Sequence, residues 1–337
     1  MKYQNIELHN VWDTYDAEDA FGISRLPLGI VDDINKNARN MSKLASACEI
    51  RGVLKEGGEA KIVLKVLDDN VVPPVVLVYR GDFCEQTIYL QQENTEIIIK
   101  DIPKQKTMED IANKEGFAFH PKLVRVRLPH IHNVHIVSIE GDLSYPDKEL
   151  LPKKTLLSYG SSITHGASSI SADGTYASQC ARKLGYDLIN LGVGGAAQMD
   201  MPIADHIATR DDWDIATLEM GINVRNWEPK KFREAVDLFV TKIVETCPDK
   251  YIFCIDLFTN DADFEKREDI AIGFREIVRE IANKFNSSKV MHIDGREILK
   301  DPYGLRTDLV HPNCHGMQEM GFNLADKIFN HLKSTST

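Results

Sequence analysis

The stretch TLLSYGSSITHG (residues 155–166) holds an apolar run of strand length that ends in Gly160 and leads directly into a polar segment. Later apolar runs have similar lengths: YDLINLG (186–192), DIATLEMG (214–221), KYIFCIDLF (250–258) and KVMHID (289–294). Helical periods lie between them, the clearest over 266–285 and another over 229–247, which opens with Pro229. Buried strands that alternate with helices predict a parallel sheet flanked by helices.

The chain before this stretch has a different period. EAKIVLKVL (59–67) alternates apolar and charged residues, and the same period of two recurs in VVLVYR (75–80), TEIIIK (95–100), LVRVRL (123–128) and NVHIVSIEG (133–141). Many short strands predict a β-sandwich or jelly roll. The polar stretch 142–154 contains two prolines and is expected to be the linker. We therefore expect a β-sandwich domain over 1–148 and an α/β domain over 149–337.

Length and composition fit two soluble domains and exclude some partners. The chain has 337 residues, with 40 Lys+Arg against 51 Asp+Glu and a net charge of −11. This acidic balance argues against nucleic acid or an anionic membrane as a partner, and it suits a neutral ester or sugar. The first residues show no basic region followed by an apolar core, so no secretory signal is expected. The six cysteines form no CxxC pair. A cytoplasmic location is expected, while self-association into a homo-oligomer stays open.

Ser162 follows the glycine that ends the first strand of the α/β domain. Ligands of parallel sheets bind at the carboxyl ends of the strands, near helix N-termini that favour negative charge. A serine hydroxyl needs a base to become a nucleophile, and its alternative role here is a helix N-cap. DLVHP (308–312) supplies the base, because a turn lets Asp308 accept a hydrogen bond from one His311 nitrogen. We predict a triad of Ser162, His311 and Asp308, with a solvated surface turn as the other interpretation of DLVH.

Acyl transfer also needs hydrogen-bond donors for the oxyanion. NLGVGG (190–195) ends the second strand, and Gly195 has a bare backbone N–H to offer. GIN (221–223) ends the third strand, and Asn223 adds a side-chain amide. A tight turn and a helix cap are their alternative roles. All these elements lie at successive strand ends, which favours one site.

In the order Ser, Gly, Asn, His, these four blocks resemble the SGNH (GDSL-type) hydrolases over residues 155 to about 331. The resemblance implies a flavodoxin-like three-layer α/β/α domain without metal or organic cofactor. It also implies an acyl-enzyme mechanism in which the N–H groups of Ser162 and Gly195 and the Asn223 amide form the oxyanion hole. Ser161 and Val224 stand where the family usually has aspartates, and both changes put substrate choice in doubt.

The chain is most similar to a branch of that family with a β-rich N-terminal domain and a YGSSIT block. Several such members are carbohydrate esterases that remove acetyl groups. The resemblance therefore implies hydrolysis of a small acyl ester, acetyl above all, on a small-molecule or oligosaccharide substrate. A lipid esterase or thioesterase of the same family is the nearer alternative. A carbohydrate-binding module joined to an inactive hydrolase is the non-enzymatic one.

Other signals compete with this interpretation. GVGGAA (192–197) fits the dinucleotide pattern G-x-G-x-x-A, but it follows the second strand of the domain rather than the first. An ordinary α/β-hydrolase would need glycine at Thr164. The segment HIHNVH (130–135) hints at a metal site, but an exposed strand face is expected.

Two further residues are secondary candidates for binding substrate. His165 lies three residues after Ser162, and helical geometry directs its ring away from the serine. Trp227 follows the Asn block and forms either a wall of the substrate pocket or ordinary core packing.

Overall fold

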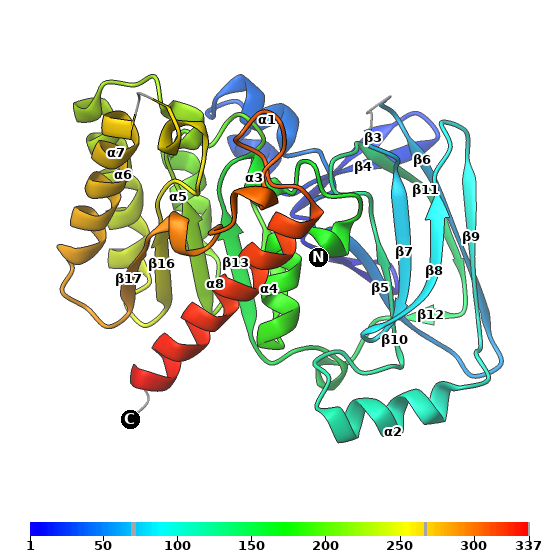
Figure 1. Cartoon of the computed structure of the whole chain (residues 1–337). Coiled ribbons are helices and arrows are strands. Elements are labelled where there is room, and N and C mark those ends of the chain that lie inside the picture. Colours follow the sequence, from blue (N-terminus) through cyan, green and yellow to red (C-terminus); the bar gives the residue numbers. More distant parts are fainter. Residues whose placement is uncertain (69–71, 266–267, 336–337) are drawn as a thin grey trace.

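The computed structural model describes residues 1–68, 72–265 and 268–335. A β-rich N-terminal domain lies beside an α/β domain (Figure 1). Two antiparallel sheets form the β-rich domain. One has the order β1 (Lys2–Tyr3), β2 (Ile6–His9), β5 (Glu49–Leu54), β10 (Leu123–Arg127), β7 (Val75–Arg80), β8 (Phe83–Tyr89), with β12 (Leu143–Ser144) on β5; the other is β3 (Asp13–Ala17), β4 (Ala20–Ser24), β11 (Val134–Gly141), β6 (Glu59–Val66), β9 (Thr95–Lys100).

Alternation along these strands fills one core between the two sheets. Ala60, Ile62, Leu64 and Val66 of β6 are buried in that core, whereas Lys61 and Lys65 are half-buried on the other face. Two helices interrupt the β-structure, α1 (Lys36–Met41) and α2 (Gln105–Glu115), and the alternating pattern predicted neither. Residues 143–144 of the expected linker pair with β5 as a strand.

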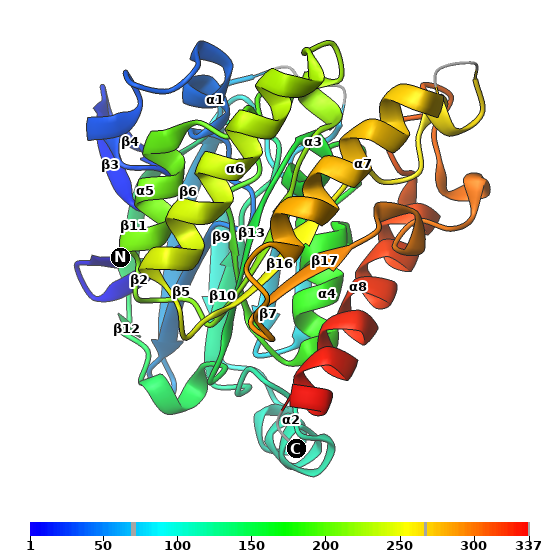
Figure 2. The same cartoon turned by 90° about the vertical axis from the view of Figure 1, so that its left-hand side faces the viewer.

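The α/β domain has a five-stranded parallel sheet. Its order is β14 (Asp187–Asn190), β13 (Thr155–Tyr159), β15 (Ile215–Glu219), β16 (Tyr251–Ile255), β17 (Val290–Ile293). Helices α4 (Tyr176–Leu184) and α8 (Cys314–Thr335) pack together on one face; α5 (Met201–Thr209), α6 (Pro229–Thr246) and α7 (Glu268–Asn283) cover the other (Figures 1 and 2). The strand order 2-1-3-4-5 is that of flavodoxin-like folds, which confirms the expected fold class.

The helical period over 266–285 predicts one apolar face made of Ile270, Phe274, Ile277, Val278, Ile281 and Phe285. Phe274, Ile277, Val278 and Ile281 are buried as expected, and Phe285, just after helix α7, is half-buried against the core. Ile270 is 49% exposed because it lies in the first turn of the helix, beyond the edge of the core. Residues 266–267 of the expected helix lie outside the described residues.

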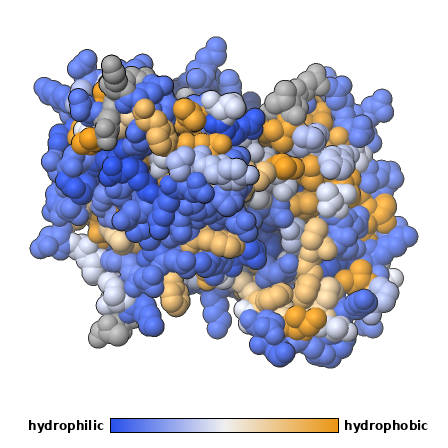
Figure 3. Space-filling view, viewed as in Figure 1, coloured by the Kyte–Doolittle hydropathy of each residue, from blue (hydrophilic) through white to orange (hydrophobic). Residues whose placement is uncertain are grey.

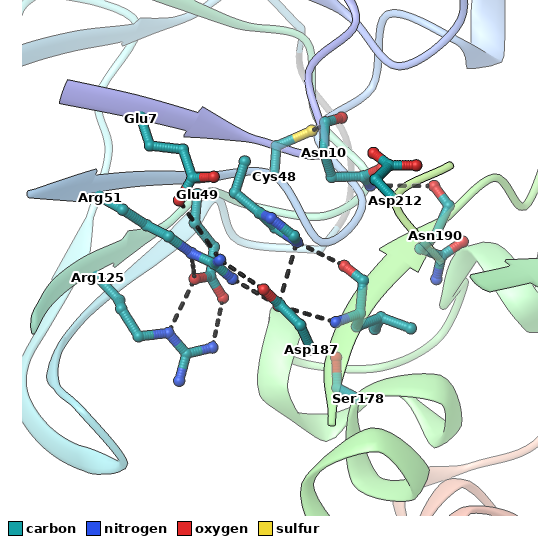
Figure 4. A network of polar contacts seen from close by, with 12 residues as sticks. Glu7, Asn10, Cys48, Glu49, Arg51, Arg125, Ser178, Asp187, Asn190 and Asp212 are labelled. Carbon is teal, nitrogen blue, oxygen red and sulfur yellow. Dashed lines mark hydrogen bonds and ion pairs between the residues drawn. The ribbon is translucent and has the colours of Figure 1, made fainter. Parts of the chain in front are cut away.

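A network of buried charges joins the β-rich domain to the edge strand β14 (Figure 4). Arg51 of β5 donates two hydrogen bonds of 2.7 Å each to the Asp187 carboxylate. Arg125 of β10 donates to both Glu49 oxygens, at 2.9 and 2.7 Å. Burial alone would raise the pKa of Glu49, but Arg125, Arg51 and Arg127 hold it well below its usual range. The network therefore fixes the strand whose end leads into the glycine block.

The visible surface differs between the two domains. Apolar residues gather over the β-rich domain, whereas the surface over the helices of the α/β domain is largely hydrophilic (Figure 3). Of the helices within residues 1–68, 72–265 and 268–335, none combines the length and apolar content that crossing a bilayer requires.

Candidate active site

Ser162 begins a short helix, α3 (Ser162–His165), directly after β13 and Gly160. The N-cap of this helix is Ser161, whose hydroxyl accepts the Ile163 N–H at 3.2 Å. The capping role considered for Ser162 therefore belongs to its neighbour, and the Ser162 hydroxyl stays available. The helix ends after one turn at Gly166, whose φ of 105° lies in the left-handed region.

The turn from Asp308 to His311 brings a carboxylate and an imidazole to this serine. The Asp308 carboxylate accepts the backbone N–H groups of Val310 and His311 at 2.9 Å each, and Leu309 takes a positive φ of 54° inside the turn. Asp308 Oδ2 lies 2.9 Å from His311 Nδ1, and His311 Nε2 lies 2.8 Å from Ser162 Oγ. The arrangement can pass a proton from the serine hydroxyl to the ring.

The Asp308 carboxylate is stabilised as an anion. Burial would raise its pKa, but the hydrogen bonds from the backbone N–H groups of His311 and Val310, and from the His311 ring, together hold it below the usual range. The Asp308 side chain is 50% exposed, so solvent screens its charge.

The three donors predicted for the oxyanion have no acceptor in the described part of the chain: the N–H groups of Ser162 and Gly195 and Nδ2 of Asn223. A Cβ on Gly194 would lie 3.8 Å from Ser162 Cβ, so the glycine block packs against the turn that carries Ser162. Gly195 itself has a positive φ of 66°. Asn223, in the 3-10 helix η4 (Ile222–Val224), accepts the Ala197 N–H through Oδ1 at 3.0 Å, and this bond leaves Nδ2 free to donate.

His165 is buried, with Nε2 only 3.0 Å from the His130 carbonyl oxygen of the β-rich domain. Burial holds the pKa of His165 well below its usual range, so the ring is neutral. Its contact with substrate stays a prediction. Trp227 is half-buried against the core, with Lys231 Nζ lying 3.8 Å from its ring centroid. His165 lines a cavity beside Asp308. Trp227 is not among the described residues that line this cavity or a second cavity beside Asn223.

The expected exposed strand face at residues 130–135 is wrong. His130, His132 and His135 are all buried, and the first two lie in the loop between β10 and β11. His130 Nε2 lies 3.0 Å from the Gly166 carbonyl oxygen, so this loop packs against the end of α3. Burial lowers the pKa of His130 to about 4. Within the described residues no cluster of three or more potential ligands has metal-binding geometry.

Two cavities are lined by residues of the predicted site, and the sequence analysis predicted neither. One of about 430 Å³ lies beside Asp308 and Gly194. Its apolar wall includes Met41, Leu44 and Ile131 of the β-rich domain, residues far from Asp308 in sequence. The other, of about 410 Å³, is lined by residues that include Asn223 and Ile270. A larger cavity of about 660 Å³ lies between the domains near Arg125 and Asp187, and no residue of the predicted triad lines it.

The glycine block does not have the geometry of a dinucleotide site. In that fold a helix begins directly after the glycines and binds the pyrophosphate at its N-terminus. Here α5 begins only at Met201, and the block itself packs against Ser162.

Several solved structures share this fold at low sequence identity. A salicylyl-acyltransferase from a tetracycline biosynthetic pathway is 16% identical, with a TM-score of 0.78 over 97% of this chain and 95% of that one. A putative GDSL-like lipase from Bacteroides ovatus is 19% identical, with a TM-score of 0.72 over 98% and 96%. An acetyl xylan esterase from the rumen bacterium Butyrivibrio proteoclasticus is 14% identical, with a TM-score of 0.58 over 99% and 97%. At these identities the likeness shows the fold alone.

No curated protein matches this sequence. A family model does, and it describes GDSL-like lipases and acylhydrolases. The match covers residues 153–331, which span both β13 and the Asp308–His311 turn. Because it covers more than half of the 337 residues, the chain belongs to the GDSL-like lipase/acylhydrolase family.

Proposed function

We propose that the protein is a serine ester hydrolase with Ser162 as nucleophile, His311 as general base and Asp308 as the group that orients the ring. The observation that carries this proposal is the continuous chain of contacts, 2.8 Å from Ser162 Oγ to His311 Nε2 and 2.9 Å from His311 Nδ1 to Asp308 Oδ2. A hydrogen bond on each ring nitrogen fixes both its tautomer and its orientation.

In the proposed reaction, Ser162 Oγ attacks the ester carbonyl carbon while its proton moves to His311 Nε2. The N–H groups of Ser162 and Gly195 and the Asn223 amide donate to the oxyanion of the tetrahedral intermediate. When the bond to the alcohol oxygen breaks, His311 returns the proton to the leaving alcohol and Ser162 carries the acyl group. Water then attacks the acyl carbon, gives its proton to His311, and releases the carboxylic acid as the serine recovers its proton.

We infer that the substrate is a small acyl ester, with an acetylated carbohydrate as the first class to test. The family supports the reaction class. The acetyl xylan esterase among the structural neighbours supports the substrate class by analogy of fold.

A second candidate, hydrolysis of esters with a larger apolar acyl group, is favoured by the cavity beside Asp308. Its volume of about 430 Å³ exceeds what an acetyl group fills, and Met41, Leu44 and Ile131 offer apolar contact to a longer chain.

Hydrolysis of p-nitrophenyl acetate, butyrate and octanoate by wild type and Ser162→Ala tests both candidates. Turnover that disappears in Ser162→Ala supports the serine mechanism. Preference for acetate then favours the small-acyl substrate, and preference for octanoate favours the apolar one. Full activity of Ser162→Ala would overturn the proposal.

A further inference from the structure

Glu219, the last residue of the central strand β15, lies directly beneath the nucleophile turn. Its side chain is buried, with only 1% of the residue exposed. Oε2 accepts the backbone N–H of Ser161 at 2.5 Å and the Thr164 hydroxyl at 3.1 Å. These two donors lie on either side of Ser162 in sequence. The carboxyl group of Glu219 therefore holds both ends of the turn that carries the nucleophile.

The strand before the nucleophile leaves space for this carboxyl group. A Cβ on Gly160 would lie 2.4 Å from Glu219 Oε2 and 2.3 Å from Thr164 Oγ1. Real Cβ atoms do not approach oxygen so closely, so glycine is required at position 160 for Glu219 to reach Ser161. The carboxyl group is built into the site and is not a chance neighbour.

Glu219 differs from Glu49, the other deeply buried glutamate among the described residues, in having no cation beside it. Glu49 is surrounded by Arg51, Arg125 and Arg127, which pair with it at 3.1 Å or less. Within the described residues, no lysine or arginine forms an ion pair with Glu219. A buried carboxyl group without a cation is costly to the fold and is characteristic of functional sites.

The titratable groups around Glu219 come from three other elements. Tyr176 of α4 reaches it through Thr164, whose Oγ1 lies 2.7 Å from the tyrosine hydroxyl. Tyr159 of β13 and His311 of the Asp308 turn interact with it electrostatically. Of these three groups, only His311 becomes positively charged, and it does so when it takes the Ser162 proton.

We propose that Glu219 is a positioning residue of the hydrolase site, which fixes the Ser162 turn and stabilises the His311 imidazolium with its negative charge. This inference rests on the proposed function. Asp308 supplies the other negative charge, but solvent screens it because its side chain is 50% exposed. The charge of Glu219 acts through the protein interior, where a Coulomb interaction is stronger.

The pKa of Glu219 is consistent with this role over a limited pH range. Burial raises its pKa, and the hydrogen bonds from Ser161 and Thr164 and the interaction with His311 offset only part of that rise. The carboxyl group therefore loses its charge at a higher pH than an exposed glutamate does.

The test is Glu219→Gln, which keeps an oxygen acceptor for the Ser161 N–H but removes the charge. Because a nearby anion favours the imidazolium, its loss should move the acid limb of the kcat/KM profile to lower pH. We expect kcat to fall by roughly tenfold, because the transition state loses part of the stabilisation of its imidazolium. A purely structural role would lower kcat without moving the limb.

Asp256→Asn is the matched control. Asp256 follows the neighbouring strand β16, is 1% exposed and accepts the Gly295 N–H at 2.7 Å. Its side chain pairs with His292 at 2.7 Å rather than with the nucleophile turn. This variant should keep the acid limb of the wild type. An unmoved limb in Glu219→Gln, or the same shift in both variants, would overturn the inference.

Two further comparisons keep the test decisive. If Glu219→Gln does not fold, Glu219→Asp and Glu219→Asn differ from each other only in charge, and only the Asn variant should shift the limb. The proposed function is checked separately by Ser162→Ala. An inactive Ser162→Ala beside a Glu219→Gln with wild-type kcat and limb refutes the role of Glu219 alone, whereas an active Ser162→Ala refutes the serine mechanism itself.

Discussion

Replacement of Asn223 by alanine separates oxyanion stabilisation from folding. The side chain makes one hydrogen bond that belongs to the fold, accepting the Ala197 N–H at 3.0 Å, while its Nδ2 donor is free. Losing the first bond costs about 1 kcal/mol of stability. Losing an oxyanion donor costs about 2.7–4 kcal/mol in the transition state, which corresponds to about 10²–10³-fold in kcat. We therefore expect a folded protein with a large loss of turnover.

The assay is steady-state hydrolysis of p-nitrophenyl acetate, with thermal unfolding measured on the same samples. KM should change little, because the donor acts on charge that develops only in the transition state. Asn226→Ala is the control: this exposed asparagine lines the same cavity as Asn223 and should keep wild-type kcat. If Asn223→Ala loses less than about threefold in kcat, Asn223 is not an oxyanion donor.

Three other predictions follow from the same geometry. Asp308→Asn should lower kcat by roughly 10⁴-fold without unfolding the protein, since the carboxylate orients the base and is half exposed; near-normal kcat would contradict this role. Gly160→Ala should lower both melting temperature and activity, because its Cβ would lie 2.4 Å from a Glu219 oxygen, and a wild-type melting temperature would be inconsistent with that contact. Burial would raise the pKa of Asp187, but Arg51 lowers it to about 2. This folded pKa is below the unfolded value, so Asp187 contributes about 2 kcal/mol of stability above roughly pH 4 that is lost toward pH 2. The free energy of unfolding of Asp187→Asn, measured with urea, should therefore depend less on pH in that range than that of wild type. An equal pH dependence in the two proteins would contradict the contribution of Asp187.

The α/β domain was predictable because its signals are local. Each strand is a short apolar run, and β13 shows why: Leu156 packs in the core on one face of the sheet, and Leu157 in the core on the other. Since the carboxyl ends of parallel strands meet at one edge, the blocks at residues 160–166, 190–195 and 221–223 were expected to converge. Ser162 and His311 do lie within hydrogen-bonding distance, although 149 residues separate them.

The rest of the site depends on contacts that a local pattern does not encode. Met41 and Ile131 reach the cavity beside Asp308 only because the two domains pack together, and no feature of their own segments indicates it. The same packing buries His130 against Gly166, whereas His132 and His135 are buried against Asp68 and Tyr15 within the β-rich domain, and these non-local contacts explain why the expected exposed strand face was wrong. Glu219 is visible in the sequence as a single carboxylate at the end of an apolar strand, but its hydrogen bond with Ser161 is evident only from the structure.

The most direct test of the central claim is to trap the acyl-enzyme. Wild type and Ser162→Ala are mixed with p-nitrophenyl acetate, quenched in acid before turnover is complete, and examined by intact-mass spectrometry and peptide mapping. His311→Ala serves as a comparison, because the serine there lacks its base and should acylate far more slowly. We expect one added acetyl group in wild type, located on Ser162, and none in Ser162→Ala. An acetyl group on another residue of an active enzyme, or an equal burst of p-nitrophenol from Ser162→Ala, would contradict it.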